Sequence, residues 1–385
     1  MNVAFVTPFY NGSCDGRFGR FHDWVHTLRD MKNPPFKFDV VALTSSNPDQ
    51  TLSSHPHSYL GDGNELWGSK LNKLEFIMNL QRIRRDLRKN SYDIIHILRL
   101  DSLLYPTTMN VIDDSRVVLG PNVGGWSPIR RFDHRKTEST AEQLKRVTSF
   151  RWRQLLASRA RYDIAISFSD YHQRILAEIG FDPRRVRNLH PGVETIFSPD
   201  HKTKNNIPTL LYVGDLTIYK GYNIFLHAVE KISQEVNVLM AGQGTPDVNL
   251  IQTLNIGDMV THLGFVERQA LPKYYNSAEL LVVPSMDEMG PNTIVEALAC
   301  GTPVVATDRP GINEYPPVDA SILFSPRNAD ALASALDTAL SELDTLTAAA
   351  NKHAPEFRAD RTVKALDDIY REILNTTLED KSTTN

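Results

Sequence analysis

The sequence predicts an α/β protein made of two doubly wound domains, each built on a parallel sheet that helices cover on both faces. Short, unbroken runs of Val, Ile and Leu alternate with helical patterns along the whole chain, and such runs are typical of parallel strands that are buried on both sides. The 385 residues are enough for about two domains of ordinary size. The composition, 41% hydrophobic and 23% charged, is that of a soluble globular protein.

The expected strands fall into two sets along the chain. The first set comprises residues 3–6, 39–43, 94–98, 117–119, 164–167 and 186–189. The second set comprises residues 210–213, 237–241, 260–263, 280–283, 304–306 and 322–324. Because doubly wound domains bind ligands at the carboxyl ends of their strands, we expect the two domains to face each other across a ligand-binding cleft.

The two sets of strands also predict the domain boundaries. We place a first domain at residues 1–198, a polar linker at 199–208 and a second domain at 209–355. A helix is expected at 356–374, because apolar residues recur there on one helical face. They are Val363, Leu366, Ile369, Tyr370 and Ile373. The polar residues 375–385 are expected to form a disordered tail.

The overall charge and the cysteines restrict the function classes. The net charge of -4 gives no global attraction to nucleic acid, so no nucleic-acid partner is expected. Cys14 and Cys300 fall in different predicted domains, and we interpret both as thiols in a reducing compartment. No apolar run approaches the ~20 residues of a membrane span, and the strand at residues 3–6 leaves no room for a signal peptide. These observations predict a cytoplasmic protein.

The stretch after the predicted strand at 280–283 holds the most informative motif. A short helix is expected at 293–300. Glu288 then lies in the loop that leaves the strand, and Glu296 points from the helix. The backbone amides of residues 292–294 form an anion site at the helix start. Two carboxylates at this spacing can also be solvated residues on a helix surface, but the flanking strand favours a binding site. Amides for phosphate and carboxylates for hydroxyls fit a nucleotide sugar.

This stretch resembles the donor site of the retaining family-four glycosyltransferases (glycosyl transferases group 1), which have the GT-B fold of two Rossmann-like domains. Other segments carry the resemblance in the same order and spacing as the family, namely residues 190–199, 212–221, 241–246 and 263–266. The resemblance implies that the second domain binds the nucleotide-sugar donor and that the first domain lies on the acceptor side. It also implies that the helix at 356–374 crosses back to the first domain.

The resemblance implies roles for individual residues. Glu288 would contact the hexose of the donor, Glu296 the ribose hydroxyls and Lys220 the diphosphate, with Glu288 and Lys220 as the catalytic residues. The whole implied donor set is Gly16, Gly214, Lys220, Val266, Glu288, Met289, Gly290, Asn292, Thr293 and Glu296.

Three positions depart from the family's pattern. Asp215 stands where many members have an arginine beside the phosphates, and its carboxylate would repel a desolvated diphosphate unless it turns away or Arg17 substitutes. Asn122 lies in a loop that lacks the histidine often found near the reacting sugar. It is the candidate acceptor-side residue, able to form hydrogen bonds but not to act as an acid or base. Only Gly16 matches the family's pair of glycines after the first strand.

A basic stretch at residues 130–161 includes Phe150 and Trp152 among its cations. One interpretation is an ordinary charged helix face. The other is a surface that meets anionic lipid headgroups or a polyprenyl-phosphate-linked acceptor. The second interpretation would place the protein peripherally on the cytoplasmic face of the membrane.

Neither a metal nor a cofactor is expected. The chain contains no Asp-x-Asp sequence, and His22 and His26, one helical turn apart, have no evident third ligand. Lys220 and the helix amides are therefore expected to handle the diphosphate charge, with the nucleotide sugar as a co-substrate.

The main hypothesis is a retaining, metal-independent hexosyltransferase that moves a hexose from a nucleotide diphosphate sugar to a hydroxyl acceptor, such as a lipid-linked or cell-surface glycan precursor. Two alternatives stay open. Asp215 and the missing histidine motivate a nucleotide-sugar-binding subunit of a glycan-assembly complex that has lost transfer. A nucleotide-sugar epimerase would share the two-domain fold, and it would interconvert sugars without any acceptor.

Overall fold

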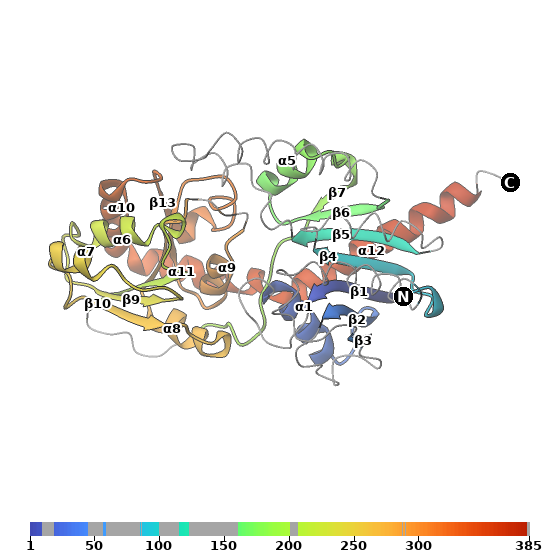
Figure 1. Ribbon diagram of the computed structural model, residues 1–385, viewed down its shortest axis with the longest axis horizontal. Coiled ribbons are helices and arrows are strands. Elements are labelled where there is room, and N and C mark those ends of the chain that lie inside the picture. Colours follow the sequence, from blue (N-terminus) through green and yellow to red (C-terminus); the bar gives the residue numbers. More distant parts are fainter. Residues whose placement is uncertain are drawn as a thin grey trace, which may run out of the picture. The chain divides into compact units, whose positions relative to one another are not determined.

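The chain forms two compact α/β units (Figure 1). The first unit comprises Met1–Leu189 together with Thr362–Asn385, and the second comprises His190–Arg361. The computed structural model describes residues 1–9, 19–44, 57–58, 85, 87–99, 115–122, 161–200, 207–286, 288 and 290–382.

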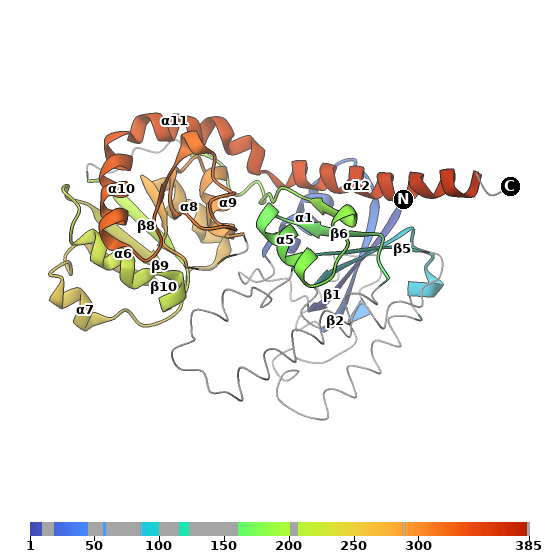
Figure 2. The same ribbon diagram turned by 90° about the horizontal axis from the view of Figure 1, so that it is seen from above.

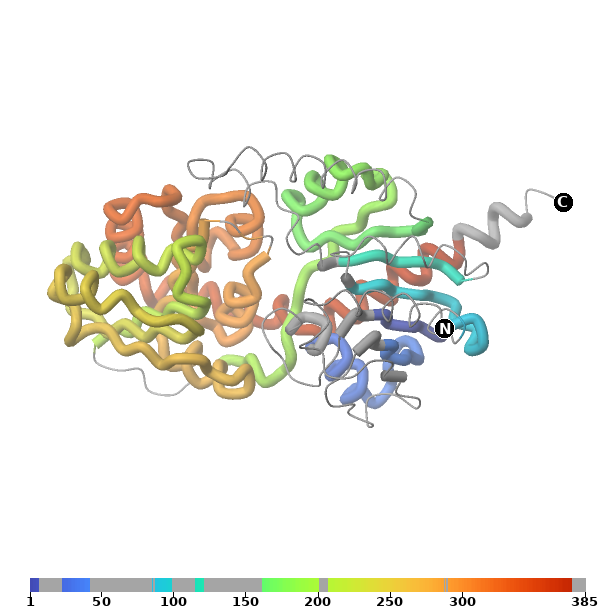
Figure 3. Tube along the Cα trace, viewed as in Figure 1, coloured from blue at the N-terminus to red at the C-terminus, as the bar shows by residue number. Residues whose placement is uncertain are grey.

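The first unit is built on a seven-stranded sheet in the order β3-β2-β1-β4-β5-β6-β7. Its strands all pair in parallel, and the coloured parts of the strands lie side by side in Figure 3. They are β1 (Asn2–Phe9), β2 (Lys37–Thr44), β3 (His57–Ser58), β4 (Ile94–Arg99), β5 (Arg116–Asn122), β6 (Ile164–Ser167) and β7 (Val186–Asn188). Its helices include α1 (Gly19–Asp30), α5 (Asp170–Glu178) and most of α12 (Ala359–Ser382). Every strand predicted for this half is present, and β3 is an addition that the sequence did not predict.

Helices α1 and α12 bury their apolar faces against one side of this sheet. Alternate residues of a strand point to the same side, and those of β1 and β4 join the helices in one apolar cluster. The cluster includes Val3, Phe5, Trp24, Leu28, Ile94, Leu98, Val363, Leu366 and Tyr370. From Thr362 onwards α12 therefore belongs to the first unit, as the resemblance implied.

His96 on β4 is a fully buried polar residue beneath α12. Its Nε2 donates to the Gly120 carbonyl at 2.8 Å, and its Nδ1 accepts from the Tyr370 hydroxyl at 2.6 Å. Because a carbonyl can only accept, the proton of the neutral ring lies on Nε2. Burial lowers the pKa of His96 to about 3, although the bond to the Gly120 carbonyl acts in the opposite direction. The neutral ring thus links β4 and β5 to α12.

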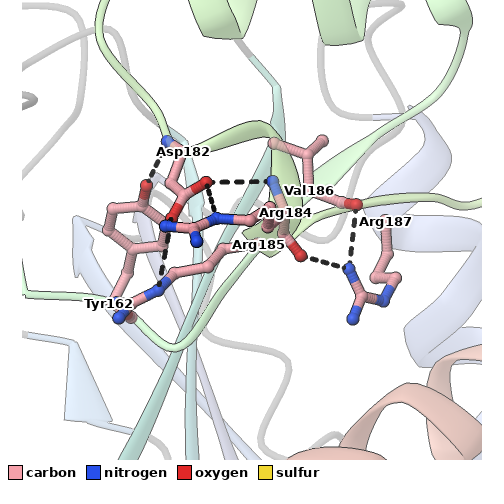
Figure 4. A network of polar contacts seen from close by, with 6 residues as sticks. All are labelled: Tyr162, Asp182, Arg184, Arg185, Val186 and Arg187. Carbon is pink, nitrogen blue, oxygen red and sulfur yellow. Dashed lines mark hydrogen bonds and ion pairs between the residues drawn. The ribbon is translucent and has the colours of Figure 1, made fainter.

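A polar network fixes the chain between β6 and β7 (Figure 4). Asp182 caps the 3-10 turn η2 (Pro183–Arg185), since its Oδ1 accepts from the Arg184 amide at 3.0 Å. Its own amide donates to the Tyr162 hydroxyl at 2.8 Å, and burial raises the pKa of Tyr162. The Arg184 side chain also pairs with Asp182, but it is 89% exposed, so this ion pair adds little stability.

The second unit is built on a six-stranded parallel sheet in the order β10-β9-β8-β11-β12-β13. Its strands, all of which were predicted, are β8 (Thr209–Val213), β9 (Asn237–Ala241), β10 (Val260–Gly264), β11 (Leu280–Val283), β12 (Val304–Thr307) and β13 (Ser321–Phe324). Its helices are α6 (Tyr222–Val229), α7 (Val248–Thr253), α8 (Leu271–Ser277), α9 (Asn292–Ala299), α10 (Ala329–Ser341) and α11 (Leu343–His353). Short 3-10 turns are η3 (Ile218–Lys220), η4 (Arg268–Ala270), η5 (Val318–Ala320) and η6 (Ala354–Phe357).

The core of the second unit lies between the sheet and helices α6 and α10, which contact each other (Figure 2). The buried cluster includes Leu210, Phe225, Leu226, Val238, Leu280, Leu332 and Leu336. Leu210, Val238 and Leu280 of this cluster lie on β8, β9 and β11, which are inner strands of the sheet. Because these strand residues are apolar and buried, the polar side chains that could bind a ligand lie in the loops at the strand ends.

The boundary between the units lies earlier than the sequence predicted. The chain enters the second unit after Leu189 rather than after residue 198. The reason is a backbone contact with a distant segment, because the Val193 amide donates to the Phe357 carbonyl at 2.8 Å and the Ala359 amide donates to the Val193 carbonyl at 2.9 Å. Such a pairing leaves no pattern in the sequence.

The predictions for the linker and the C-terminus also need correction. The predicted linker at 199–208 lies within the span of the second unit rather than between the units. Helix α12 begins at Ala359 and continues to Ser382, so the prediction of a disordered tail from residue 375 is wrong for most of that segment. A helix that is already formed and docked extends at little cost, because each further residue adds one hydrogen bond.

Acid is expected to destabilise the first unit through His96. The folded state holds this ring neutral down to about pH 3, whereas the unfolded chain protonates it below about pH 6.5. The unfolded state therefore binds more protons in this range, and the free energy of unfolding falls by up to about 1.4 kcal/mol per pH unit as the pH decreases. The measurement is the urea midpoint at pH 5.0 to 7.0. Tryptophan fluorescence reports the first unit alone, since the tryptophans are at positions 24, 67, 126 and 152.

The variant His96→Gln removes the titrating group. It should be less stable at pH 7 and should show a shallower pH dependence between pH 5.0 and 6.5. Equal slopes for the variant and the natural protein would contradict the assignment.

Candidate functional site

The candidate site lies at the topological switch point of the second unit. Strands β8 and β11 are neighbours, but the chain continues from β8 to β9 on one side and from β11 to β12 on the other. The loops at their carboxyl ends therefore run in opposite directions and leave a crevice, which is where doubly wound sheets bind ligands. The segment after β8 carries Lys220, and the segment after β11 carries Glu288.

These two segments are held together by their backbones. The Met286 amide donates to the Tyr219 carbonyl at 2.7 Å. Gly221 has a left-handed φ of 70°, and a Cβ atom at this position would lie 2.1 Å from the Pro284 carbonyl oxygen. Only glycine combines this conformation with so close an approach. The spacing between Lys220 and the loop after β11 is thus fixed by main-chain geometry.

The side chains of Lys220 and Glu288 form an ion pair between Nζ and Oε1. The lysine is 30% exposed and the glutamate 15% exposed, so both remain accessible to a ligand. The sequence predicted these two residues as the catalytic pair, and the structure brings them into direct contact. The contact gives Lys220 a counter-ion that an incoming anion can replace.

Tyr212, near the end of β8, contacts Asp215 in the segment that follows this strand. The Tyr212 hydroxyl donates to the backbone carbonyl of Asp215 at 2.8 Å. Burial, followed by the charges of Asp215 and Glu288, raises the pKa of Tyr212 well above its usual value, so the hydroxyl stays protonated. The Asp215 side chain is exposed. It therefore remains solvated, and the repulsion expected of a desolvated carboxylate is reduced.

Helix α9 begins where the Glu288 loop ends. Pro291 is its N-cap and makes no side-chain cap hydrogen bond, and the first turn contains no acidic residue. Asn292 and Thr293 are half-buried, and Ile294 is fully buried. The helix starts one residue before the predicted range of 293–300 and ends at Ala299, so Pro291 precedes the first turn. The amides of this turn and the helix dipole favour an anion at this end.

Glu296 lies deeper than the sequence prediction placed it. Its side chain is 4% exposed, and its Oε1 forms an ion pair with Nη1 of Arg268. Its Oε2 accepts from the Tyr275 hydroxyl at 2.7 Å. Neither Arg268 nor Tyr275 belongs to a recognisable sequence pattern, so neither was predicted as a site residue, and only the fold brings η4 and α8 to α9.

The loops after β9 and β10 join this site through main-chain contacts. The Gly214 amide donates to the Ala241 carbonyl, and the Gly242 amide donates to the Gly264 carbonyl, both at 2.8 Å. A Cβ atom at Gly242 would lie 1.9 Å from the Gly214 carbonyl oxygen. These glycines therefore allow successive loops to approach each other closely. Val266, a member of the implied donor set, is half-buried just beyond β10.

Cys300 follows α9 and is a buried free thiol. Burial, followed by the charge of Glu296, raises the pKa of Cys300 to about 12. The sulfur is therefore protonated at neutral pH and is not a nucleophile.

Some of the predicted features fall outside the described residues. These are Gly16, Met289, the side chain of Asn122 and nearly all of the basic stretch at 130–161. Within the described residues, no three His, Cys, Asp or Glu side chains gather in a way that could hold a metal ion. In the same part of the chain, no helix has the length and apolar character needed to cross a membrane.

Residues 193–355 match the family model of the glycosyl transferases group 1. The matched residues lie within the second unit. The chain is 29% identical over 223 residues to a D-inositol 3-phosphate glycosyltransferase of Geodermatophilus obscurus, covering 51% of this chain and 50% of the relative. A second enzyme of that name, from Mycolicibacterium smegmatis, is 33% identical over 217 residues, covering 50% of this chain and 49% of the relative. The chain thus spans about half the length of these relatives.

Solved structures share the fold of the whole chain. The Anabaena protein HepE in complex with UDP and glucose superposes with a TM-score of 0.72 and 18% identity, covering 97% of this chain and 100% of HepE. Sucrose-phosphate synthase from Thermosynechococcus elongatus gives the same TM-score and identity over 97% of this chain and 99% of that protein. The chain therefore has the two-domain GT-B fold that the sequence predicted.

Replacing Gly221 by alanine is expected to destabilise the second unit by at least about 2 kcal/mol, because the new side chain meets the Pro284 carbonyl and the left-handed backbone disfavours it. Thermal unfolding followed by circular dichroism measures the change. Gly257→Ala is the matched control, since Gly257 is exposed and a Cβ atom there would meet only Ile251 at 3.9 Å. Equal melting temperatures for the two variants would show that the close approach is not a constraint.

Proposed function

We propose that the protein transfers a hexose from a nucleotide diphosphate sugar to a hydroxyl acceptor, with retention of configuration at the anomeric carbon and without a catalytic metal. The observation that carries this proposal is the Lys220–Glu288 pair, positioned at the switch point beside the start of α9. A cation and a helix N-terminus together favour a diphosphate, and an adjacent carboxylate can accept hydrogen bonds from sugar hydroxyls.

The donor would replace Glu288 as the partner of Lys220. In this arrangement the Lys220 ammonium and the first-turn amides of α9 bind the diphosphate, Glu288 is released to orient the hexose, and Glu296 accepts hydrogen bonds from the ribose. Each charge-assisted bond to the departing diphosphate contributes about 1.5–3 kcal/mol. Such bonds accelerate the reaction because they strengthen as charge develops on the leaving group.

The reaction exchanges one bond of the anomeric carbon for another. The bond to the diphosphate oxygen breaks, and a bond to the acceptor oxygen forms on the same face of the sugar. The acceptor hydroxyl gives its proton to the departing phosphate oxygen, so no side chain has to act as a general base. Asn122 is retained as the acceptor-side residue of the proposal, in a hydrogen-bonding role.

The named relatives support the choice of substrates. HepE was solved with UDP, and with UDP and glucose, which makes UDP-glucose the first donor to test. The D-inositol 3-phosphate glycosyltransferases point to a hydroxyl-bearing acceptor. A lipid-linked or cell-surface glycan precursor has the same chemistry. The Asp215 side chain is exposed. Its charge is therefore a weaker argument for the alternative of a nucleotide-sugar-binding subunit that has lost transfer.

The donor can be identified by thermal shift against a panel of nucleotide sugars. A ligand that binds only the folded state stabilises it by about 2.7 kcal/mol at a hundredfold excess over its dissociation constant. With that donor, release of the nucleoside diphosphate should fall by roughly 100-fold or more in Lys220→Met and in Glu288→Gln, because each variant removes an interaction with the donor. Arg184→Met, which breaks the exposed pair with Asp182, should keep normal turnover.

Near-normal turnover in both site variants would refute the assignment. The same assay separates the alternatives. Donor binding without release of the nucleoside diphosphate would favour a binding subunit, and chromatographic interconversion of the sugars without acceptor would favour an epimerase.

A further inference from the structure

The strongest unassigned feature is the buried cluster around Glu296. Arg268 from η4 and Tyr275 from α8 each engage a different oxygen of this carboxylate, through Nη1 and through a hydroxyl at 2.7 Å. Arg268 is 7% exposed and Tyr275 is 0% exposed. In a surface ion pair, water competes for the hydrogen bonds of both partners. The pair of Arg268 and Glu296 is almost completely buried, so water has little access to it.

Arg268 is itself held by an aromatic side chain. Its Cζ lies 4.7 Å from the centroid of the Phe197 ring, and that ring lies 6.1 Å from the ring of Tyr275. The guanidinium therefore stacks on one side and pairs with Glu296 on another. Planar guanidinium groups suit such a stacked and paired site, whereas an ammonium does not stack in the same way.

Burial without a counter-ion would change the chemistry of Glu296. A buried carboxyl group that lacks a cation takes up a proton rather than remaining charged. The protonated form would present a donor as well as an acceptor, and it would bind vicinal hydroxyls less strongly than the charged form. Burial and the charge of Glu296 also raise the pKa of Tyr275 well above its usual value, so its hydroxyl remains a donor to Oε2.

The Glu296 carboxylate keeps hydrogen-bond acceptor positions that Arg268 and Tyr275 do not use. An ionised carboxylate has about two acceptor positions on each oxygen, and Arg268 and Tyr275 occupy one on each. One acceptor position on each oxygen therefore remains, which matches a pair of neighbouring hydroxyls. A ribose presents such a pair at its 2′ and 3′ positions.

We propose that Arg268 and Tyr275 are positioning residues that keep Glu296 ionised and oriented to accept hydrogen bonds from the ribose hydroxyls of the donor. This inference rests on the proposed function, and it adds residues that set the preference for a ribonucleotide over a 2′-deoxyribonucleotide. Arg268 supplies the charge, Tyr275 fixes the orientation, and Phe197 holds the guanidinium in place.

The test compares UDP with 2′-deoxy-UDP by calorimetry at pH 6.5 and pH 9.0. The natural protein should bind UDP about 10- to 100-fold more tightly at both pH values, since a hydrogen bond to a charged group is worth about 1.5–3 kcal/mol. In Arg268→Met this preference should fall below about threefold at pH 6.5 and return in part at pH 9.0, because alkaline pH favours the charged form of a buried carboxyl group. A pH-dependent preference is a result that a purely structural role of Arg268 would not give.

Conservative variants complete the test. Arg268→Lys should keep a pH-independent preference, because it retains the charge. Tyr275→Phe removes one hydroxyl at nearly constant volume and should lower the preference at both pH values. Arg184→Met, with its exposed pair in the first unit, should behave as the natural protein.

The outcomes separate the inference from the proposed function. If neither UDP, GDP nor ADP binds to the natural protein, the proposed function fails. If the natural protein binds UDP without preferring it to the deoxy form, or if Arg268→Met keeps the preference at pH 6.5, the inference is overturned. Should Arg268→Met fail to fold, an unchanged preference in Tyr275→Phe overturns the inference, and a reduced one supports it.

Discussion

The site depends on one close main-chain approach, that of Gly221 to the carbonyl of Pro284. This contact and the hydrogen bond from the Met286 amide hold the loops after β8 and β11 at a fixed separation. The Lys220–Glu288 ion pair forms across that separation. Because the constraint lies in the backbone, exchange of the lysine's partner from a carboxylate to a diphosphate needs only side chains to move.

The second unit places its two important carboxylates in contrasting environments. Glu288 is partly exposed and has a flexible lysine as its partner, which suits a residue that changes partners during a reaction. Glu296 is buried, and a stacked arginine and a tyrosine hold it. Removing one member of a buried pair costs far more than removing one member of an exposed pair. The first carboxylate can therefore respond to the donor, while the second is fixed in advance.

The sequence predicted the parallel strands because they are encoded locally, and its resemblance to a family singled out Lys220 and Glu288. Continuous apolar runs reveal buried parallel strands, and the strand-loop-helix pattern places Glu288 beside a helix start. The sequence could not reveal contacts that depend on the fold. In the sequence, Arg268 looks like any charged residue of a loop. Only the packed structure shows that it is buried and paired with Glu296. The end of the first unit was misplaced for the same reason, since the pairing of Val193 with Arg358 joins distant segments.

The most direct test of this account is a crystal structure with the nucleoside diphosphate that the protein binds best. We expect Lys220 Nζ to leave Glu288 and to lie within hydrogen-bonding distance of a diphosphate oxygen, with the first-turn amides of α9 on the same group. A diphosphate bound elsewhere in the second unit, with Lys220 still paired to Glu288, would contradict it.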